Sequence, residues 1–212
     1  MTEPRSVRTV PGMGGKVFDF RETGLCPPNP GGRFRPLVMV HHIPVVKQAP
    51  GLADFQKLGG ILVGRGVAIQ ASTDAEGNVS LFSRWDEKCF GHLGANSVAC
   101  GIEHMHFKVK EEWTEGQMRA AAWCSWRVWK SFGIPPRRAI LTPGAGHLEG
   151  DEFVLDAPVG VQRRGHTSHE HVSNMIGSGQ RSDPGRKFSF KHLYELTRFF
   201  DENRTFKGAP EL

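Results

Sequence analysis

The sequence lacks any apolar run that approaches the length of a membrane-spanning helix, so we expect no insertion into a membrane. Its first residues, MTEPRSVRTVPGMGGKV, contain no apolar core of the kind that a secretory signal peptide needs. Charged residues, proline and glycine interrupt this stretch instead. The absence of a signal predicts a soluble protein made in the cytoplasm. The sequence also contains no internal repeat.

Cysteine is scarce and irregularly spaced. The chain has four cysteines, and no two of them form a CxxC pair: Cys26, Cys89, Cys100 and Cys124. Without a secretion signal, the simplest expectation is four free thiols that are buried as small apolar side chains. The cysteines are therefore not expected to bind a metal.

The length and composition fit one globular domain, because 212 residues are enough to bury a core but leave no room for a second large domain. Five tryptophans and fourteen phenylalanines supply large apolar side chains for that core. We expect a monomer. The net charge of +5 and the pI of about 9.2 favour an anionic partner, either nucleic acid or a bacterial wall that carries acidic polymers. The sign of the charge alone does not choose between these partners.

Residues 1–36 are predicted to form an irregular N-terminal arm, because proline and glycine interrupt any regular pattern. The continuous apolar stretch 37–46, LVMVHHIPVV, predicts a strand in a sheet that is covered on both faces. Residues 47–60 are expected to be a connection with one helical turn. A hairpin is predicted around the turn DAEGN at 74–78, and a further strand at 97–106.

The second half of the chain contains two predicted helices. Thr114 opens a capping-box pattern, and apolar residues at helical spacing follow it to about Phe132, where Gly133 predicts the end. Another helix is expected after Ser189. Between them lies a glycine- and proline-rich excursion that includes a predicted strand at 159–164. These elements predict an α/β domain with a central mixed β-sheet flanked by helices.

Histidines gather in two segments that are far apart in the sequence. His41 and His42 end the predicted strand at 37–46. The later segment, RGHTSHEHVSNMIGSGQRSDPGRKF, holds three histidines and an aspartate: His166, His169, His171 and Asp183. Two sources of histidine and one aspartate predict a three-ligand metal site. A three-ligand site leaves a fourth position open for water, as in catalytic zinc centres.

Three motifs in a fixed order carry a resemblance to a known family. LVMVHH, then GHLGANSVACGIEH, then SHEHVS with RSDPG resemble the zinc-dependent N-acetylmuramoyl-L-alanine amidases of the amidase-2 or peptidoglycan-recognition-protein type, which include many phage endolysins. The resemblance spans most of residues 37–200. It implies an amidase-2-like fold, with a catalytic domain over 37–205 and a C-terminal tail at 206–212.

The resemblance implies a zinc ligand set of His41, His169 and Asp183. His42 is then expected to point to the opposite face of the strand, because successive strand residues alternate. His166 and His171 remain alternatives to His169. The sequence departs from the family pattern at Gly91, where a tryptophan is usual, and in the long excursion before the second ligand.

The resemblance also implies catalytic and substrate-binding residues. Glu103, in the sequence Gly-Ile-Glu, matches the acidic residue that takes a proton from the zinc-bound water and gives it to the leaving amine. Arg181 stands where many members have lysine and would stabilise the oxyanion. His92 and Asn96 are expected to contact substrate. For His92, a hydrogen bond within its own turn is an equally good interpretation.

The implied function is zinc-dependent hydrolysis of the amide between N-acetylmuramic acid and L-alanine in bacterial peptidoglycan. We expect a phage endolysin that stays in the host cytoplasm until lysis and then acts on the cell wall. A cytoplasmic amidase that recycles anhydro-muropeptides and a non-catalytic peptidoglycan-binding module are the alternatives. A metal-dependent nuclease is disfavoured, because basic residues are scattered and no compact His-Asn-His site or paired carboxylate site is evident.

Overall fold

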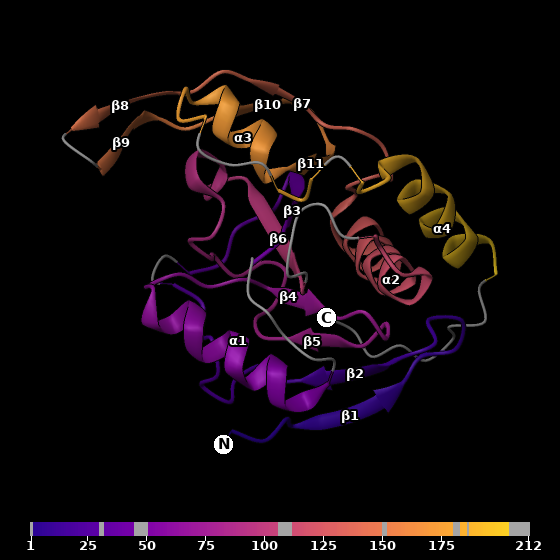
Figure 1. Ribbon diagram of the computed structural model, residues 1–212. Coiled ribbons are helices and arrows are strands. Elements are labelled where there is room, and N and C mark those ends of the chain that lie inside the picture. The colour runs from indigo at the N-terminus through magenta and orange to yellow at the C-terminus, as the bar shows by residue number, and fades with distance from the viewer. Residues whose placement is uncertain are drawn as a thin grey trace.

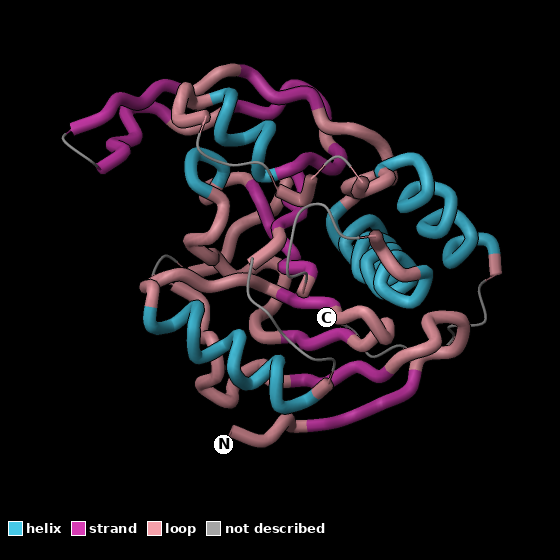
Figure 2. The backbone as a smooth tube through the Cα atoms, viewed as in Figure 1, coloured by secondary structure: helices cyan, strands magenta, loops and turns pink. Residues whose placement is uncertain are grey.

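Seven strands form a mixed sheet with helices on both faces in this computed structural model (Figures 1 and 2). The structure describes residues 2–29, 32–44, 51–105, 112–149, 152–179, 183–185 and 187–203. The strand order is β1 (Ser6–Thr9), β2 (Lys16–Asp19), β5 (Val79–Leu81), β4 (Ala71–Thr73), β6 (Ala99–His104), β3 (Val38–His42) and β11 (Gly165–Ser168). The prediction of an α/β fold with a central mixed sheet is confirmed.

Strand β3 lies near one side of the sheet, between β6 and β11, and is parallel to both. All five of its residues are buried, because layers of side chains cover the sheet on both faces. Burial on both faces explains why the strand begins as an unbroken apolar run. Two histidines end it. Strands β3 and β6 confirm that a strand lies within each of the predicted ranges 37–46 and 97–106, and residues 45, 46 and 106 lie outside the described residues.

The hairpin predicted around residues 74–78 is confirmed by the antiparallel pair β4 and β5. The Asp74 carboxylate closes its turn, since Oδ1 accepts hydrogen bonds from the backbone N–H groups of Glu76 and Asn78 at 3.0 and 2.8 Å. Gly77 has φ of 85°, a value that favours glycine. The turn is therefore fixed by its own sequence.

The two longer helices on one face agree with the predictions. Helix α2 (Glu115–Phe132) begins after Thr114, whose side-chain oxygen accepts from the backbone N–H of Gln117, and ends at Gly133 with φ of 69°. Helix α4 (Phe190–Glu202) begins after Ser189, which caps it in the same way. Both helices lie against the same face of the sheet (Figure 1). Within the described residues, no helix has the length and apolar character needed to cross a bilayer.

Two parts of the structure differ from the prediction. Residues 1–36 are not an irregular arm throughout, because β1 and β2 extend the sheet beside β5. Each of these strands has only four residues, which are too few to show the alternation of apolar and polar residues that predicts a strand. Helix α1 (Leu52–Gly64) replaces the predicted connection and the start of the predicted hairpin arm. Adjacent glycines lower the helix propensity of this segment, but burial of Phe55, Leu58 and Leu62 on the sheet outweighs that cost.

The excursion before the late histidines folds into two antiparallel pairs. Strand β7 (Ile140–Thr142) pairs with β10 (Gly160–Arg163), which confirms the strand predicted at 159–164, and β8 (Ala145–Glu149) pairs with β9 (Glu152–Ala157). The hairpin of β8 and β9 projects from the body (Figure 1). Beneath these pairs, α3 (His169–Met175) follows β11 directly and packs near the short turn η1 (Leu93–Ala95).

All four cysteines are free and buried, as predicted. Burial raises the pKa of the Cys26 thiol to about 11 and that of the Cys89 thiol to about 12. Burial also raises the pKa of Cys100 and Cys124. These groups therefore stay protonated near neutral pH and serve as small apolar side chains.

We expect Gly15→Ala to destabilise the protein, because the added Cβ would lie 2.1 Å from the backbone oxygen of Gly77. The first two strands would have to move away from the β4–β5 turn, at a cost of about 1–3 kcal/mol. Gly60→Ala in α1 is the matched control, since its Cβ would meet nothing within 4 Å and would raise helix propensity. Urea unfolding measures both. Equal stability of the two variants would contradict the close contact of the N-terminal strands with the β4–β5 turn.

Candidate functional site

The two adjacent histidines of β3 face different layers of the protein. His41 points with Met39 toward the layer of α2 and α4, where its ring lies 5.1 Å from the ring of Phe188. His42 points to the opposite face, toward α3, and its ring centroid lies 4.4 Å from that of His169. The alternation of strand side chains causes this division.

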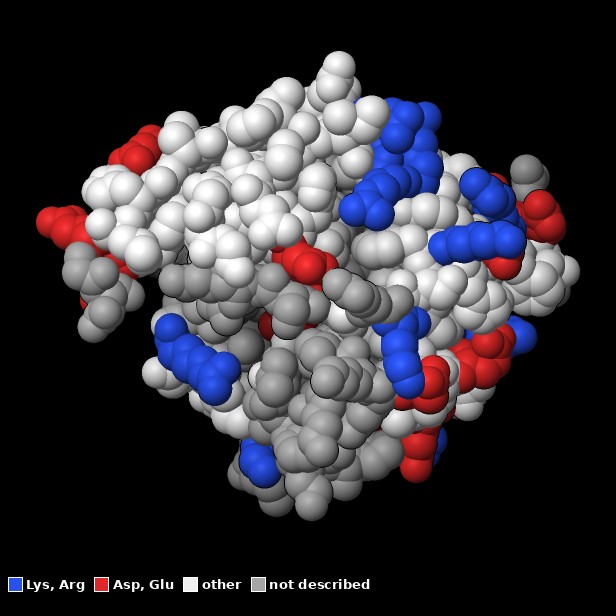
Figure 3. All heavy atoms as spheres, turned by 45° about the horizontal axis from the view of Figure 1, so that its top comes forward, with Lys and Arg blue, Asp and Glu red and all other residues white. Residues whose placement is uncertain are grey.

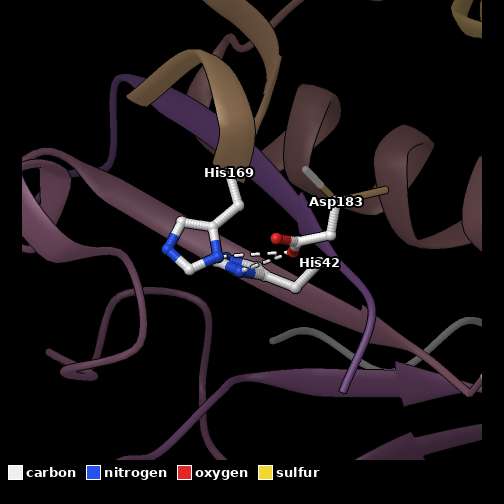
Figure 4. Close-up of side chains that lie close together, drawn as sticks. All are labelled: His42, His169 and Asp183. Atoms are coloured by element: carbon white, nitrogen blue, oxygen red, sulfur yellow. Dashed lines mark hydrogen bonds and ion pairs between the residues drawn. The ribbon is translucent and has the colours of Figure 1, made fainter. Parts of the chain in front are cut away.

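His42, His169 and Asp183 meet on the second face (Figure 4). Nδ1 of His169 lies 3.3 Å from Oδ2 of Asp183, and Nδ1 of His42 lies 3.8 Å from the same oxygen. One ligand atom from each residue lies within 4.8 Å of the other two, and all three residues are buried. Among the described residues, this is the group of three whose geometry could hold a metal ion.

Local structure brings the three side chains together. Strand β11 pairs with β3 so that Ser168 lies opposite His41, which places the start of α3 at the end of β3. His169 is the first residue of that helix, and the Ser168 hydroxyl caps it. The Asp183 backbone oxygen accepts from the N–H of Glu170, and its carboxylate accepts from the N–H of Ile43 at 3.2 Å. The carboxylate is therefore tied to both histidine-bearing elements.

The donor set fits a divalent cation such as zinc. Two imidazole nitrogens and one carboxylate oxygen are typical of catalytic zinc sites, and ligand atoms around a tetrahedral ion lie about 3.3 Å apart. The observed separations of 3.3 and 3.8 Å are close to this value. Burial, and then the nearby His169 and His92, hold the pKa of His42 well below its ordinary value. His42 is thus the neutral imidazole that a metal requires.

His92 contacts the ring nitrogen of His42 that does not face Asp183. Its Nδ1 lies 2.9 Å from Nε2 of His42, at hydrogen-bond distance, which leaves Nδ1 of His42 to face Asp183. His92 packs over Gly101, where a Cβ would lie 2.1 Å from its Cε1 atom. Burial lowers the pKa of His92 to about 3. The position is that of a residue that orients a metal ligand, because an imidazole ligand usually shares its second nitrogen with a partner.

A cavity of about 520 Å³ opens beside the three residues. Its lining includes His42, His169, Asp183, Glu103, Asn96 and Arg65. Glu103 lies opposite His42 in the register of β6 and β3, so both side chains are on the same face of the sheet. A volume of this size lies within the usual range of roughly 300–1,000 Å³ for a small-molecule site.

Four of the residues predicted for the site line this cavity, Asn96, Glu103, His169 and Asp183, whereas His41 and His92 do not. Asn96 lines it, and its Oδ1 also accepts from the backbone N–H of His92 at 2.8 Å. His92 itself is fully buried and is not part of the lining, so its contact is with His42 rather than with the open space. Arg181 lies outside the described residues.

His41 belongs to a different network. His41 Nδ1 lies 2.9 Å from Nε2 of His104, and His41 Nε2 lies 3.0 Å from Nδ1 of His166. Thr73 extends this network, because its hydroxyl lies 2.8 Å from Nδ1 of His104. These imidazoles lie in a buried row below Phe188. The ligand set implied by the resemblance, with His41 first, is therefore not the set that the structure brings together, and His42 occupies that place.

The three late histidines separate in the same way. His169 faces Asp183, whereas His166 lies in the buried row with His41. His171 is only partly buried, on the side of α3 near Arg138. Alternation along β11 and the turn of α3 account for the separation. The alternation of strand residues predicted that neighbouring histidines face opposite layers of the protein. The sequence did not indicate which of these layers contains Asp183.

The chain belongs to the amidase-2 family of N-acetylmuramoyl-L-alanine amidases, whose pattern matches residues 33–186. The most similar solved structures include the endolysin amidase LysCS from Clostridium intestinale URNW, with 17% identity and a TM-score of 0.54 over 78% of this chain and 85% of that chain. Staphylococcus aureus hydrolase AmiA aligns over 100% of both chains with 13% identity and a TM-score of 0.60.

A recognition protein shares the fold as well. Drosophila peptidoglycan recognition protein SD has 13% identity and a TM-score of 0.54 over 81% of this chain and 90% of that chain. No curated protein gave a significant sequence match. At these identities, the structural likeness establishes the fold alone, and the residues of the site must carry the argument for catalysis.

We expect His42→Ala to abolish metal binding and His41→Ala to preserve it. His42 supplies one of the three donors, whereas His41 faces the other layer. His41→Ala should instead lower the free energy of unfolding by about 1–3 kcal/mol, because it removes the contacts that His41 makes with two buried imidazoles. Metal content after dialysis, measured by mass spectrometry, checks the first expectation, and urea unfolding without metal checks the second. Loss of metal from His41→Ala alone would reverse the assignment.

Proposed function

We propose that the protein hydrolyses the amide bond between N-acetylmuramic acid and L-alanine in peptidoglycan, with zinc held by His42, His169 and Asp183. The observation that carries this proposal is the position of Glu103. Its carboxylate shares one cavity with the three ligands, opposite His42 on the neighbouring strand. A member of the amidase family with both a metal-binding group and a nearby general base has the parts that the reaction needs.

Each residue has a definite task in this proposal. Zinc, when bound, lowers the pKa of a water ligand and polarises the scissile carbonyl. Glu103 would accept a proton from the attacking water and deliver it to the departing amine of L-alanine. His92 keeps the His42 ring oriented through the contact between their nitrogens. Arg181 is proposed to stabilise the oxyanion, since it precedes Asp183 by only two residues in the sequence.

The cellular role that we propose is that of a phage endolysin, which is made in the host cytoplasm and acts on the cell wall at lysis. The likeness to an endolysin amidase and the positive net charge support this role, because bacterial walls carry acidic polymers. On the face in Figure 3, Lys and Arg form separate groups with acidic residues among them. The described residues on that face form no continuous basic stripe of the kind that nucleic-acid binding favours.

Glu103→Gln should reduce hydrolysis of purified peptidoglycan by at least about 100-fold, because general acid–base catalysis contributes about 10²- to 10⁴-fold. Metal content should remain near one ion per chain, since Glu103 is not among the three donors. Glu202→Gln, on the exposed end of α4, is the matched control and should keep full activity. The release of new L-alanine amino termini, with the glycan left intact, measures the reaction.

Two outcomes would contradict the proposal. Full activity of Glu103→Gln would remove its role as general base, and a wild-type protein that binds peptidoglycan without cleaving it would be a recognition module. Comparison of intact wall sacculi with soluble anhydro-muropeptide separates the two enzymatic roles. An endolysin should cleave sacculi, whereas a recycling amidase should prefer the soluble fragment.

A further inference from the structure

Two Arg-Arg pairs meet at the edge of the sheet that β11 forms. Arg137 and Arg138 come just before β7, Arg163 ends β10, and Arg164 lies between β10 and β11. Antiparallel pairing of β7 with β10 brings the two pairs together, and the backbone N–H of His166 donates to the oxygen of Arg137 at 2.8 Å. The fold therefore places four guanidinium groups on neighbouring segments of the chain.

Helix α4 adds a fifth arginine, Arg198, whose Nη2 donates at 3.4 Å to the backbone oxygen that precedes Arg137 in the chain. Nε of Arg137 donates to the oxygen of Arg164 at 3.2 Å, and Nη2 of Arg163 donates to the oxygen of Arg138 at 3.3 Å. These hydrogen bonds hold the side chains against one another's backbone. We refer to the five residues as the arginine surface: Arg137, Arg138, Arg163, Arg164 and Arg198.

The arginine surface is not neutralised by carboxylates. Among the described residues, none of its members forms an ion pair, and each hydrogen bond from their guanidinium groups goes to a backbone oxygen. All but Arg164 are exposed. Arginines elsewhere in the protein have a carboxylate partner within 3.2 Å: Arg5, Arg21, Arg84 and Arg119. Because a guanidinium has five N–H donors, most donors of the arginine surface remain available to a ligand.

The charges of this surface converge on one group, the phenol of Tyr194. Burial raises the pKa of that phenol, and the charges of Arg138 and Arg163 oppose the rise. Burial also lowers the pKa of His171 on α3, and Arg138 lowers it further against the opposing charge of Glu170. Like charges this close repel one another, so an anion bound among them would stabilise the protein.

The arginine surface is separate from the candidate site. None of its residues lines the cavity beside the metal-binding group or the smaller hollow of about 250 Å³ next to that cavity. His169 at the start of α3 faces Asp183, whereas His171 on the same helix lies near Arg138. Figure 1 shows β7, β10 and α4 at the top and right of the molecule, away from α1, which lines the cavity. A ligand on the arginine surface would therefore leave the cavity open to substrate.

The arrangement suits an extended polymer that carries phosphate groups. A guanidinium fork binds two oxygens of one phosphate, and arginines on three segments of chain match repeated charges better than one small anion. The ring of Tyr194 packs against the rings of His166 and Phe190, with centroid distances of 5.7 and 5.9 Å, so it is not free to stack on a base. A polymer without bases is therefore a better fit than single-stranded nucleic acid.

We propose that the arginine surface binds the phosphodiester backbone of an anionic polymer that is attached to the bacterial wall. This proposal rests on the proposed function, because a wall hydrolase meets such a polymer at the place where it acts. The arginine surface then holds the enzyme on the wall while the cavity engages the peptidoglycan. Two contacts made through one chain raise the apparent affinity above that of either alone.

The test measures binding of the Glu103→Gln variant, which should leave the wall intact, to sacculi that carry a phosphodiester-linked polymer. The same sacculi after treatment with hydrofluoric acid, which cleaves phosphodiesters, lack the polymer but keep the peptidoglycan. Binding to the untreated sacculi should be about tenfold tighter, because several exposed ion pairs that are individually weak act together. The difference should decrease as the salt concentration rises.

Arg138→Gln combined with Arg163→Gln should reduce binding to untreated sacculi to the level of treated sacculi and leave binding to treated sacculi unchanged. Arg5→Gln combined with Lys57→Gln is the matched control, because it removes the same charge from exposed positions before β1, at the opposite edge of the sheet, and on α1. The control should keep the tight binding. Equal affinity for both kinds of sacculi, the same loss in both double variants, or an equal loss on treated sacculi would overturn the proposal.

Competition distinguishes the wall polymer from nucleic acid. At equal phosphate concentration, polymer released from the wall should displace Glu103→Gln from untreated sacculi more effectively than a short DNA duplex. More effective displacement by the duplex would assign the arginine surface to nucleic acid and overturn the proposal.

Failure of the proposed reaction is distinguishable, because binding does not require cleavage. If the wild type cleaves no peptidoglycan but binding depends on the polymer and on Arg138 and Arg163, the reaction is wrong and the arginine surface stands. If the wild type cleaves peptidoglycan but binds both kinds of sacculi equally, the reaction stands and the arginine surface is wrong.

Discussion

The parallel pairing of β3 with β6 and β11 is the constraint on which the site depends. Because β3 is buried on both faces, its last two residues must present their imidazoles to opposite layers. The same register sets Glu103 opposite His42 and begins α3 beside the end of β3. A shift of one residue would exchange the faces of every side chain on the strand, so the sheet register and the site are specified together.

Burial of so many histidines is tolerated because each one shares a nitrogen with a neighbour. His41 lies in a row with His104 and His166, and His42 pairs with His92. Burial is the first cause that lowers the pKa of His41 and His42, so both are neutral. The two sets have similar chemistry but different surroundings. Among the described residues, only the set that faces α3 has a carboxylate in reach, and that difference separates a group that could hold a metal from a polar network inside the core.

The hollows beside the candidate site have walls from distant parts of the chain. Helix α1 contributes Leu58, Ile61 and Leu62 to the larger one, and β9 contributes Leu155 to the smaller one. Neither element was predicted as such from the sequence. Paired glycines hide the helical pattern of α1, and the short strands of the hairpin are largely exposed, so they lack the apolar alternation that marks a half-buried strand. The elements that line the hollows beside the candidate site are thus those with the weakest local sequence signals.

The sequence by itself determined the elements whose signals are local: the apolar run of β3, the turn at Asp74, and the caps of α2 and α4 at Thr114, Gly133 and Ser189. It also determined the family, because the order of the motifs along the chain can be read without coordinates. Only the tertiary structure decided that His42 rather than His41 meets His169 and Asp183. The physical reason is that alternation along a strand fixes two opposite faces, but the packing of α3 and of the Asp183 turn decides which face becomes the site.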